Sequence, residues 1–189
     1  MTAAHMHSKV RQAEGLYDPA FEHDSCGVAF VATLTGIPSN AIVAQGLEAL
    51  RNLDHRGAVG SDPKTGDGAG MLLQIPDGFL RSEVNFDLPR QGAYAVGNAF
   101  LPTDPELAGK AKASIEQIAS EENLTVLGWR RVPTSDASLS DLTRSNMPSF
   151  EQLFVTAKGA PLMGIALDRM AYCLRRRGPG RARLAGPAD

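Results

Sequence analysis

The stretch Glu22-His23-Asp24-Ser25-Cys26-Gly27-Val28-Ala29-Phe30-Val31-Ala32 decides how the chain is interpreted. Polar residues lead to one cysteine, and the residues after it are apolar and partly β-branched. This pattern predicts a strand over residues 26–35 that is buried on both faces. A cysteine at the start of such a strand is most often a buried structural thiol. If the peptide bond before Cys26 is cut, however, the same residue carries an α-amino group with an ordinary pKa of about 8, which can act as the base for its thiol.

Three features of the sequence favour a reactive thiol over a structural one. Gly27 leaves room for a substrate beside the sulfur, and the polar run before Cys26 does not suit a buried strand. Nothing before Leu16 has the pattern of a core segment. The thiolate is the reactive form of cysteine, and a base on the same residue removes the need for a catalytic triad. Residues 1–25 are therefore expected to be a dispensable leader.

Length and composition are those of a soluble globular domain. The chain has 189 residues, of which 43% are hydrophobic and 21% charged, enough for one domain with a core. It has no run of 18 apolar residues that would predict a membrane-spanning helix, and residues 1–14 lack the apolar segment of a secretory signal. The two cysteines, Cys26 and Cys173, lie in unlike contexts. We therefore expect reduced thiols, a cytoplasmic location and no membrane partner.

The C-terminal end of the chain is strongly basic, although the formal net charge of the chain is −2. Five arginines lie within residues 175–183. Such a run can bind nucleic acid, but here it contains no aromatic residue and shows no helical pattern after Gly178. A solvated, disordered end is the expected structure, and nucleic acid is not an expected partner.

Apolar periodicity predicts the remaining elements. Ser39 is expected to cap a helix over residues 40–54 with one core-facing stripe, and Asp104 a helix that has Pro105 at its first position. The inward residues expected for this second helix are Leu107, Ala111, Ile115 and Ile118. Further strands are expected over 71–75, 93–101, 125–132 and 153–156, further helices over 78–83 and 165–177, and a polar loop over 133–148. This mixed order predicts an α/β or α+β layered domain.

Other residues that could carry chemistry have simpler explanations. The glycine-rich run 66–70 has no Gly-Lys-Ser/Thr ending and precedes an expected strand, so it is not a phosphate-binding P-loop. The histidines lack the spacing of metal ligands, and no metal site is expected. Cys173 falls on the apolar side of the expected last helix, which indicates a small buried hydrophobe.

Several blocks of the sequence, taken together and in order, resemble one family. They are Glu22-His23-Asp24 before Cys26-Gly27-Val28, the run 50–58 (LRNLDHRGA), the run 65–70 (TGDGAG) with Gln74-Ile75-Pro76, the run 92–97 (GAYAVG) with Phe100-Leu101-Pro102, and Leu127-Gly128-Trp129-Arg130. These blocks are similar to the start of the large (alpha) subunit of glutamate synthase, which is its class II glutamine amidotransferase domain. The resemblance runs from about Leu16 to about Val155. It implies an α+β fold, namely part of the α-β-β-α sandwich of the N-terminal-nucleophile hydrolases.

The resemblance also implies roles for single residues. Residues 1–25 match the family's propeptide, residues 26–160 a partial amidotransferase domain, and residues 161–189 an atypical tail. Cys26 matches the nucleophile that attacks the side-chain amide of glutamine to give a thioester and ammonia. Arg56 matches an arginine near that cysteine that would bind substrate, although a helix C-terminal cation remains an alternative for it. Asp67 and Gly68 match a loop that shapes the site.

The whole family enzyme uses the ammonia to make glutamate from 2-oxoglutarate, in nitrogen assimilation. It carries FMN and an iron–sulfur cluster, which the resemblance places outside this segment. The implied partners are L-glutamine, the remainder of the large subunit and a small subunit.

The chain also departs from the family pattern. In this class an Asn-Gly pair supplies the oxyanion hole, and the 189 residues contain no Asn-Gly. The sequence therefore predicts little or no glutaminase activity for this segment alone. Two alternatives remain open: an inactive remnant that at most binds another subunit and exposes sheet edges, and another amidohydrolase with an N-terminal cysteine.

Overall fold

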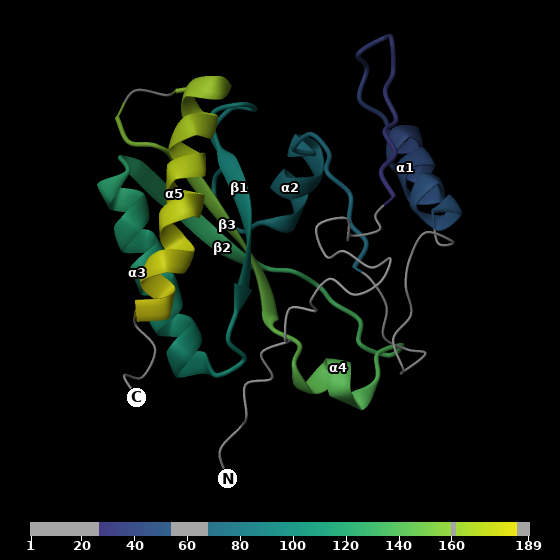
Figure 1. Cartoon of the computed structure of the whole chain (residues 1–189). Helices are drawn as coiled ribbons and strands as arrows, with labels where there is room; N and C mark the ends of the chain where they lie inside the picture. The colour runs from purple at the N-terminus through teal and green to yellow at the C-terminus, as the bar shows by residue number, and fades with distance from the viewer. Residues whose placement is uncertain (1–26, 54–67, 160–161, 185–189) are drawn as a thin grey trace, which may run out of the picture. The chain divides into compact units, whose positions relative to one another are not determined.

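The computed structural model describes residues 27–53, 68–159 and 162–184 (Figure 1). They belong to two compact units, and the boundary between the units in the sequence lies between Met71 and Leu72. The architecture is mixed α+β, as predicted. Its elements are, in chain order, α1 (Asn40–Asn52), α2 (Asp77–Glu83), β1 (Ala95–Leu101), α3 (Pro105–Glu121), β2 (Leu124–Arg131), α4 (Asp141–Ser145), β3 (Ser149–Ala157) and α5 (Ile165–Leu184). No helix in the described ranges has the length and apolar character needed to cross a bilayer.

In the first unit, α1 confirms the helix expected over residues 40–54. Ser39 has the extended backbone of an N-cap, although its side chain makes no capping hydrogen bond. None of the residues of α1 is buried, so the expected core-facing stripe was wrong. An amphipathic stripe becomes a core only where another element covers it, and the described part of this unit holds α1 as its one regular element.

The two strands expected at 26–35 and 71–75 are absent from the described residues. Residues 27–33 and 71–75 are irregular, and their side chains are exposed, to 93% for Phe30 and 99% for Leu72. A β-branched apolar run fits a half-buried pleated surface, but it becomes a strand only with a neighbour to hydrogen-bond. Cys26 itself lies outside the described residues.

The second unit is built on a three-stranded sheet in the order β1-β3-β2, in which both pairings are antiparallel. β1 and β2 are therefore parallel to each other, with α3 as the connection between them and β3 inserted between them. These strands confirm the predictions for 93–101 and 125–132, whereas β3 begins at Ser149, four residues before its predicted start. A register shift between Val126 and Gly128 places a bulge in β2.

Two helices, α3 and α5, cover one face of this sheet (Figure 1). α3 begins as predicted, because the Asp104 carboxylate accepts a hydrogen bond from the Leu107 backbone N–H at 2.8 Å. Ile118 is fully buried under the sheet, but Leu107 is exposed, so its expected inward position was wrong. The buried residues of this core are Ile118, Ala119, Leu124, Leu153, Val155, Ala157, Leu167 and Leu174.

α5 differs from its prediction at two points. It continues to Leu184, through the Gly178-Pro179-Gly180 sequence where structure was expected to stop. At Arg177, the last residue of the predicted helix, the guanidinium pairs with Glu121 at the end of α3 and with Glu122, the C-cap of α3, which ties the two helices together. Cys173 is exposed rather than buried, since one residue along a helix turns the side chain by about 100° away from the buried Leu174.

The other face of the sheet carries a second, smaller core. Along β3, Leu153 and Val155 belong to the helix-covered core, whereas Phe154 points to the opposite face. There Phe154 contacts Leu80 of α2 and Tyr94. α2 confirms the short helix expected at 78–83.

Close packing on this second face explains a glycine. The Phe86 ring lies edge-on to Phe154, with ring centroids 5.3 Å apart. A Cβ on Gly128 would lie only 2.5 Å from the Phe86 ring. Glycine at position 128 is therefore what lets Phe86 reach the sheet.

The polar segment 133–148, expected to be a loop, contains the five-residue helix α4. Its signal is local: the Ser140 hydroxyl accepts from the Thr143 backbone N–H at 3.3 Å and caps the first turn. The expectation of an uninterrupted loop was wrong because a single capped turn carries too few apolar residues to show helical periodicity.

Candidate active site

Of the four site residues expected from the sequence, the structure describes one. Cys26, Arg56 and Asp67 lie outside the described residues, so their roles stay predictions. Gly68 is exposed, and a Cβ built on it would meet no atom within 4 Å. Its loop-shaping role also stays a prediction.

The described ends of the two predicted site segments are in contact. A Cβ on Gly27 would lie 3.0 Å from Leu53 Cδ2, so any larger residue at position 27 would have to displace Leu53. Gly27 directly follows Cys26, and Leu53 precedes Arg56 by three residues. The contact therefore joins the segment that carries the expected nucleophile to the segment that carries the expected substrate arginine.

A second close approach involves Gly46, which lies seven residues before Leu53 and therefore on the same side of α1. A Cβ on Gly46 would lie 2.8 Å from the sulfur of Met71, which ends the same unit. The two glycines thus hold the chain segments at both flanks of α1 close to the helix.

In the second unit, one described cluster with shifted pKa values is formed by Asp77, Arg81 and Tyr94. The buried Tyr94 hydroxyl donates to Asp77 Oδ1 at 2.8 Å, and Arg81 Nε donates to Asp77 Oδ2 at 2.9 Å. Arg81 also donates to the backbone carbonyls of Leu88 and Pro89. The hydrogen bond from Arg81, together with that from Tyr94, lowers the pKa of Asp77. Burial, and then the hydrogen bond to Asp77, raises the pKa of Tyr94 to about 12.

This cluster ties α2 to the segment that follows it and to the start of β1. Its sequence signal is partial: Asp77 and Arg81 are an i, i+4 pair on an expected helix. Nothing local in the sequence indicates that Tyr94, seventeen residues away, completes the cluster.

Alkaline pH is expected to destabilise the second unit through Tyr94. Its folded-state pKa of about 12 lies above the unfolded value of 10.0, so the folded chain holds this proton more tightly. The stabilisation is fully present below pH 10 and is lost as pH rises toward 12, with roughly 1.4 kcal/mol lost by pH 11. Urea unfolding of the chain between pH 8 and pH 11.5 measures this slope.

Two variants separate this effect from other alkaline effects. Tyr94→Phe has no phenol at this position, so the free energy of unfolding should lose the part of its pH dependence that comes from Tyr94. Tyr172→Phe changes an exposed position on α5 and should leave that pH dependence unchanged. Identical slopes for the wild-type chain and Tyr94→Phe would contradict the assignment.

Beside this cluster, a polar ladder crosses all three strands on the same face of the sheet. Arg130 of β2 donates to Gln152 of β3 at 3.0 Å, and Gln152 donates to Asn98 of β1 at 3.2 Å. Arg130 also pairs with Glu83 of α2 at 2.6 Å, and its side chain is 10% exposed. The ladder satisfies a nearly buried guanidinium and fixes its orientation on the sheet.

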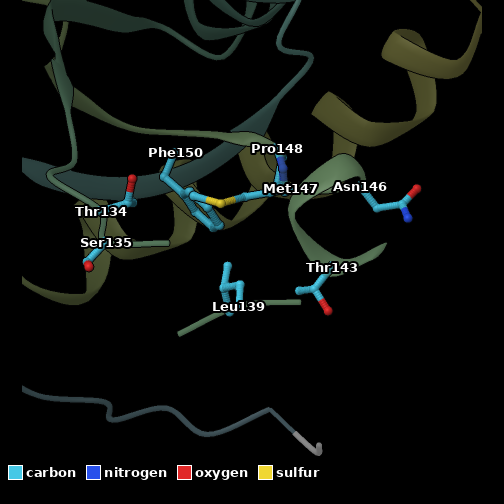
Figure 2. A pocket seen from close by; sticks show the side chains of 8 residues that line it. All are labelled: Thr134, Ser135, Leu139, Thr143, Asn146, Met147, Pro148 and Phe150. Atoms are coloured by element: carbon cyan, nitrogen blue, oxygen red, sulfur yellow. The ribbon is translucent and has the colours of Figure 1, made fainter. Parts of the chain in front are cut away.

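The third feature of this unit is a hollow of about 480 Å³, which is lined by the β2–β3 connection, including α4, and by Phe150 of β3 (Figure 2). Figure 2 shows mainly apolar side chains and hydroxyls around it, and its lining residues are Thr134, Ser135, Leu139, Thr143, Asn146, Met147, Pro148 and Phe150. None of these side chains titrates near neutral pH, so the hollow offers neither a general base nor an activated nucleophile.

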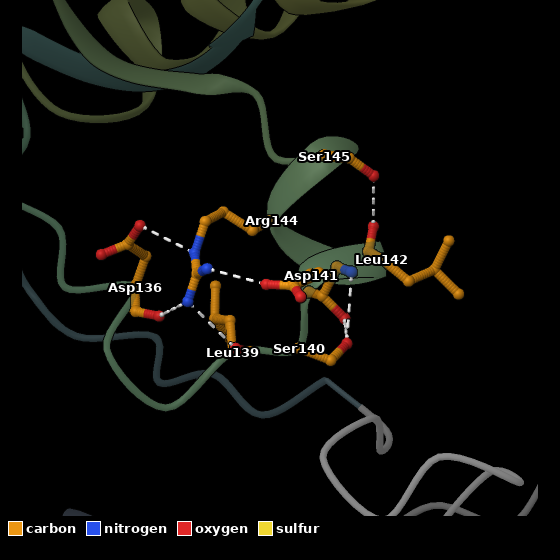
Figure 3. Close-up of polar contacts among 8 residues, drawn as sticks. Asp136, Leu139, Ser140, Asp141, Leu142, Arg144 and Ser145 are labelled. Carbon is orange, nitrogen blue, oxygen red and sulfur yellow. Dashed lines mark hydrogen bonds and ion pairs between the residues drawn. The ribbon is translucent and has the colours of Figure 1, made fainter.

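Arg144 holds together the loop that forms one side of this hollow (Figure 3). Its guanidinium contacts the carboxylates of Asp136 at 3.1 Å and Asp141 at 3.0 Å, and it donates to the backbone carbonyls of Asp136 and Leu139, each at 3.2 Å. All of its side-chain partners are exposed, which fits a structural clamp rather than a catalytic group.

The chemistry in the described ranges is therefore that of a scaffold. Within them, no group of three or more His, Cys, Asp or Glu side chains is placed to hold a metal ion. The described clusters are ion pairs and capped loops whose polar groups satisfy one another. The candidate nucleophile of the chain remains Cys26, which directly precedes Gly27 in the sequence.

Comparison with known proteins matches residues 26–185 to the class-II glutamine amidotransferases. The chain is 39% identical over 171 residues to the large chain of NADPH glutamate synthase from Bacillus subtilis, which covers 90% of this chain and 11% of the relative. It is 41% identical over 160 residues to NADH glutamate synthase from Saccharomyces cerevisiae (78% of this chain, 7% of the relative). It is 39% identical over 157 residues to a ferredoxin-dependent glutamate synthase of Synechocystis (82% and 10%).

These matches confirm the resemblance and correct its extent. The family match runs to residue 185, so the expected end of the resemblance near Val155 was wrong. α5 accounts for the difference, because its buried leucines belong to the core although the basic sequence around them resembles a solvated tail. The chain spans about a tenth of the length of these relatives.

Proposed function

Because the chain belongs to the class-II glutamine amidotransferases, we propose that it supplies the glutaminase portion of a glutamate synthase, with Cys26 as nucleophile. The observation that carries the proposal is the family match, which begins at Cys26 itself. The Gly27–Leu53 contact supports it, because it brings together the segments that carry Cys26 and Arg56. The finer fold proposed is part of an α-β-β-α sandwich, in which the sheet with α3 and α5 forms one β layer and one α layer.

In the proposed reaction, removal of residues 1–25 frees the α-amino group of Cys26. This amine accepts the thiol proton, and the thiolate attacks the side-chain amide carbon of L-glutamine. The tetrahedral adduct collapses with transfer of a proton to the leaving nitrogen, which releases ammonia and leaves a thioester. Water then attacks the thioester, which releases glutamate and restores the thiol.

Arg56 is proposed to bind the glutamine α-carboxylate, because a guanidinium matches a carboxylate in charge and geometry. Asp67 and Gly68 are proposed to shape the loop beside it. The expected partners are L-glutamine and the remainder of a synthase, including a small subunit, in the cytoplasm. Ammonia would pass from here to a glutamate-forming centre elsewhere.

The iron–sulfur cluster of the family enzyme does not fit this chain. Such clusters are held by four thiolates, and the chain has two cysteines, Cys26 and Cys173. The cluster and FMN are therefore proposed to be held outside this segment, and no step here depends on them.

The second candidate is a non-catalytic remnant. The absence of an Asn-Gly pair from the 189 residues favours it, because acyl transfer needs donors for the oxyanion. The two functions differ in a measurable way: a competent nucleophile forms a covalent adduct even where turnover is slow, and a remnant does not.

Active-site alkylation tests the proposal. The purified chain is treated with 6-diazo-5-oxo-L-norleucine, a glutamine analogue with a diazoketone in place of the amide, and its intact mass is measured. We expect a mass that begins at Cys26 and one adduct per chain, with glutamine as a competitor. Cys26→Ser should lose the adduct, together with at least about a thousandfold of any ammonia release.

Cys173→Ser is the matched control, since Cys173 is the other thiol of the chain and is exposed. It should keep the adduct. Equal labelling of the two cysteines, without competition by glutamine, would contradict the proposal and favour the remnant.

A further inference from the structure

The half-buried residues of α1 lie on one side of the helix. Their positions recur at spacings of one, three or four residues, which places them in a single row. They are Ile42, Val43, Gly46, Ala49 and Leu50, and the C-cap residue Leu53 continues the row. The remaining residues of α1 are exposed. This row is therefore the part of α1 that packs against the rest of the first unit.

At one end of the row, Leu53 packs directly against Gly27. A Cβ added to Gly27 would lie 3.0 Å from Leu53 Cδ2 and 3.4 Å from both Leu53 Cδ1 and Leu53 Cγ. Carbon atoms pack most favourably at about 3.5–4.0 Å, so a side chain at position 27 would push the whole isopropyl group of Leu53 away. The lack of a side chain at Gly27 is what lets Leu53 lie so close.

Further along the row, Gly46 contacts the segment that follows α1. A Cβ added to Gly46 would lie 2.8 Å from the sulfur of Met71. Met71 directly follows the glycine-rich run 65–70, which carries Asp67 and Gly68. One side of α1 therefore holds both the segment that begins at Gly27 and the segment that ends at Met71.

Covalent geometry extends the Leu53 contact to the expected site residues. Cys26 is bonded to Gly27, so the Cα atoms of these two residues are about 3.8 Å apart. The three residues from Leu53 to Arg56 span at most about 11 Å. A displacement of Leu53 relative to Gly27 therefore changes the separation between the segment of the nucleophile and the segment of the arginine.

We propose that Leu53 is a positioning residue for glutamine, because its contact with Gly27 sets the separation of Cys26 and Arg56. This inference rests on the proposed function, in which Cys26 attacks the side-chain amide and Arg56 binds the α-carboxylate. These two groups lie at opposite ends of one substrate molecule, so both are engaged only at one separation. Leu53 contacts neither of them in this scheme and acts through the two segments that it joins.

The test introduces a methyl group between the two segments. Each variant is made in the full chain with Cys173→Ser, so that Cys26 is the one thiol. Its modification rate is measured with 6-diazo-5-oxo-L-norleucine, which needs the glutamine site, and with iodoacetamide, which needs only the thiol. Gly27→Ala should slow the reaction with the glutamine analogue by at least about tenfold and change the iodoacetamide rate by less than about twofold.

A second substitution removes the atoms that the new methyl group would meet. Leu53→Ala deletes Cγ, Cδ1 and Cδ2 of Leu53. In this background Gly27→Ala should change the analogue rate by less than about twofold, because a double-mutant cycle isolates the contact between the two side chains. Leu53→Ala alone should slow the analogue by at least about threefold, whereas Leu53→Met conserves the volume and should react as the parent chain does.

Two matched controls change similar residues away from this contact. Gly109→Ala alters an open, exposed position on α3, and Leu47→Ala alters a side chain of α1 that is 44% exposed. Both should react as the parent chain does with both reagents. Intact mass identifies the species that begins at Cys26 in every variant, and thermal unfolding confirms that it is folded.

The possible outcomes separate this inference from the proposed function. A parent chain whose Cys26 reacts with iodoacetamide but not with the glutamine analogue would overturn both. If the parent chain reacts with the analogue, an equally fast Gly27→Ala chain would overturn the inference alone. A loss that persists after Leu53→Ala, or equal losses with both reagents, would do the same, because the effect would then lie on the thiol itself. If Gly27→Ala does not fold, equal analogue rates for Leu53→Ala and Leu53→Met would overturn the inference.

Discussion

Replacing Phe154 with alanine is expected to lower the free energy of unfolding by about 3–5 kcal/mol. The side chain is fully buried, and it is the point where α2, the Phe86 segment and the sheet meet. Its ring lies edge-on to Phe86 and stacks with Tyr94, with centroid distances of 5.3 and 6.4 Å. Truncation would leave a cavity lined by two aromatic rings. Because small domains have only about 5–15 kcal/mol of stability, the variant is expected to be close to unfolded at 37 °C.

Phe100→Ala is the matched control for this substitution. Phe100 lies on the same face of the same sheet and also has an aromatic neighbour, Phe150, but it is exposed. It should change the unfolding free energy by less than about 1 kcal/mol. Urea unfolding followed by tryptophan fluorescence compares the two, since the single tryptophan, Trp129, lies in β2. Equal losses in both variants would show that the second core contributes little.

Leu167→Ala is expected to lower the free energy of unfolding by about 2–5 kcal/mol, because Leu167 is 1% exposed and packs in the core between α5 and the sheet. This substitution tests whether α5 is part of the domain or an appended tail. Ile165→Ala, two residues away and 70% exposed, is the matched aliphatic control and should have little effect. The same urea titration measures both variants.

A small effect for Leu167→Ala would mean that α5 packs only loosely on the sheet and would restore the view of residues 161–189 as a tail. A large effect would agree with the family match, which extends to residue 185.

Local signals in the sequence predict much of the second unit. The Asp104-Pro105 start of α3 and the apolar strands β1 and β2 have complete signatures within a few residues, and the structure confirms them. α5 was predicted at its start but not at its end. Its continuation past Gly178 coincides with the pairing of Arg177 with α3, a contact that no local sequence pattern reveals.

In the first unit, by contrast, local sequence signals do not predict the structure. Residues 27–35 have strand composition, but composition describes what a strand needs and not whether a neighbouring strand is present. Phe30 is exposed for this reason. Cys26 was identified from its context and Arg56 and Asp67 from resemblance, and none of them lies within the described residues. The Gly27–Leu53 contact, which joins the segments that lead to Cys26 and Arg56, follows from packing and has no signature in the sequence beyond the glycine itself.

The central position of β3 also fixes the order in which the second unit can fold during synthesis. In the described sheet β1 and β2 both pair with β3, which is made last of the three; Val96, for example, pairs with Phe154. The sheet therefore cannot form until residues 149–157 have left the ribosome, and its helical cover is completed only by α5. Until then α3 is the longest element that can form from local contacts. The apolar segment of β1 has no β3 strand to pair with during this time. A ribosome that pauses before residue 149 would prolong the period in which the nascent chain can aggregate or pair wrongly.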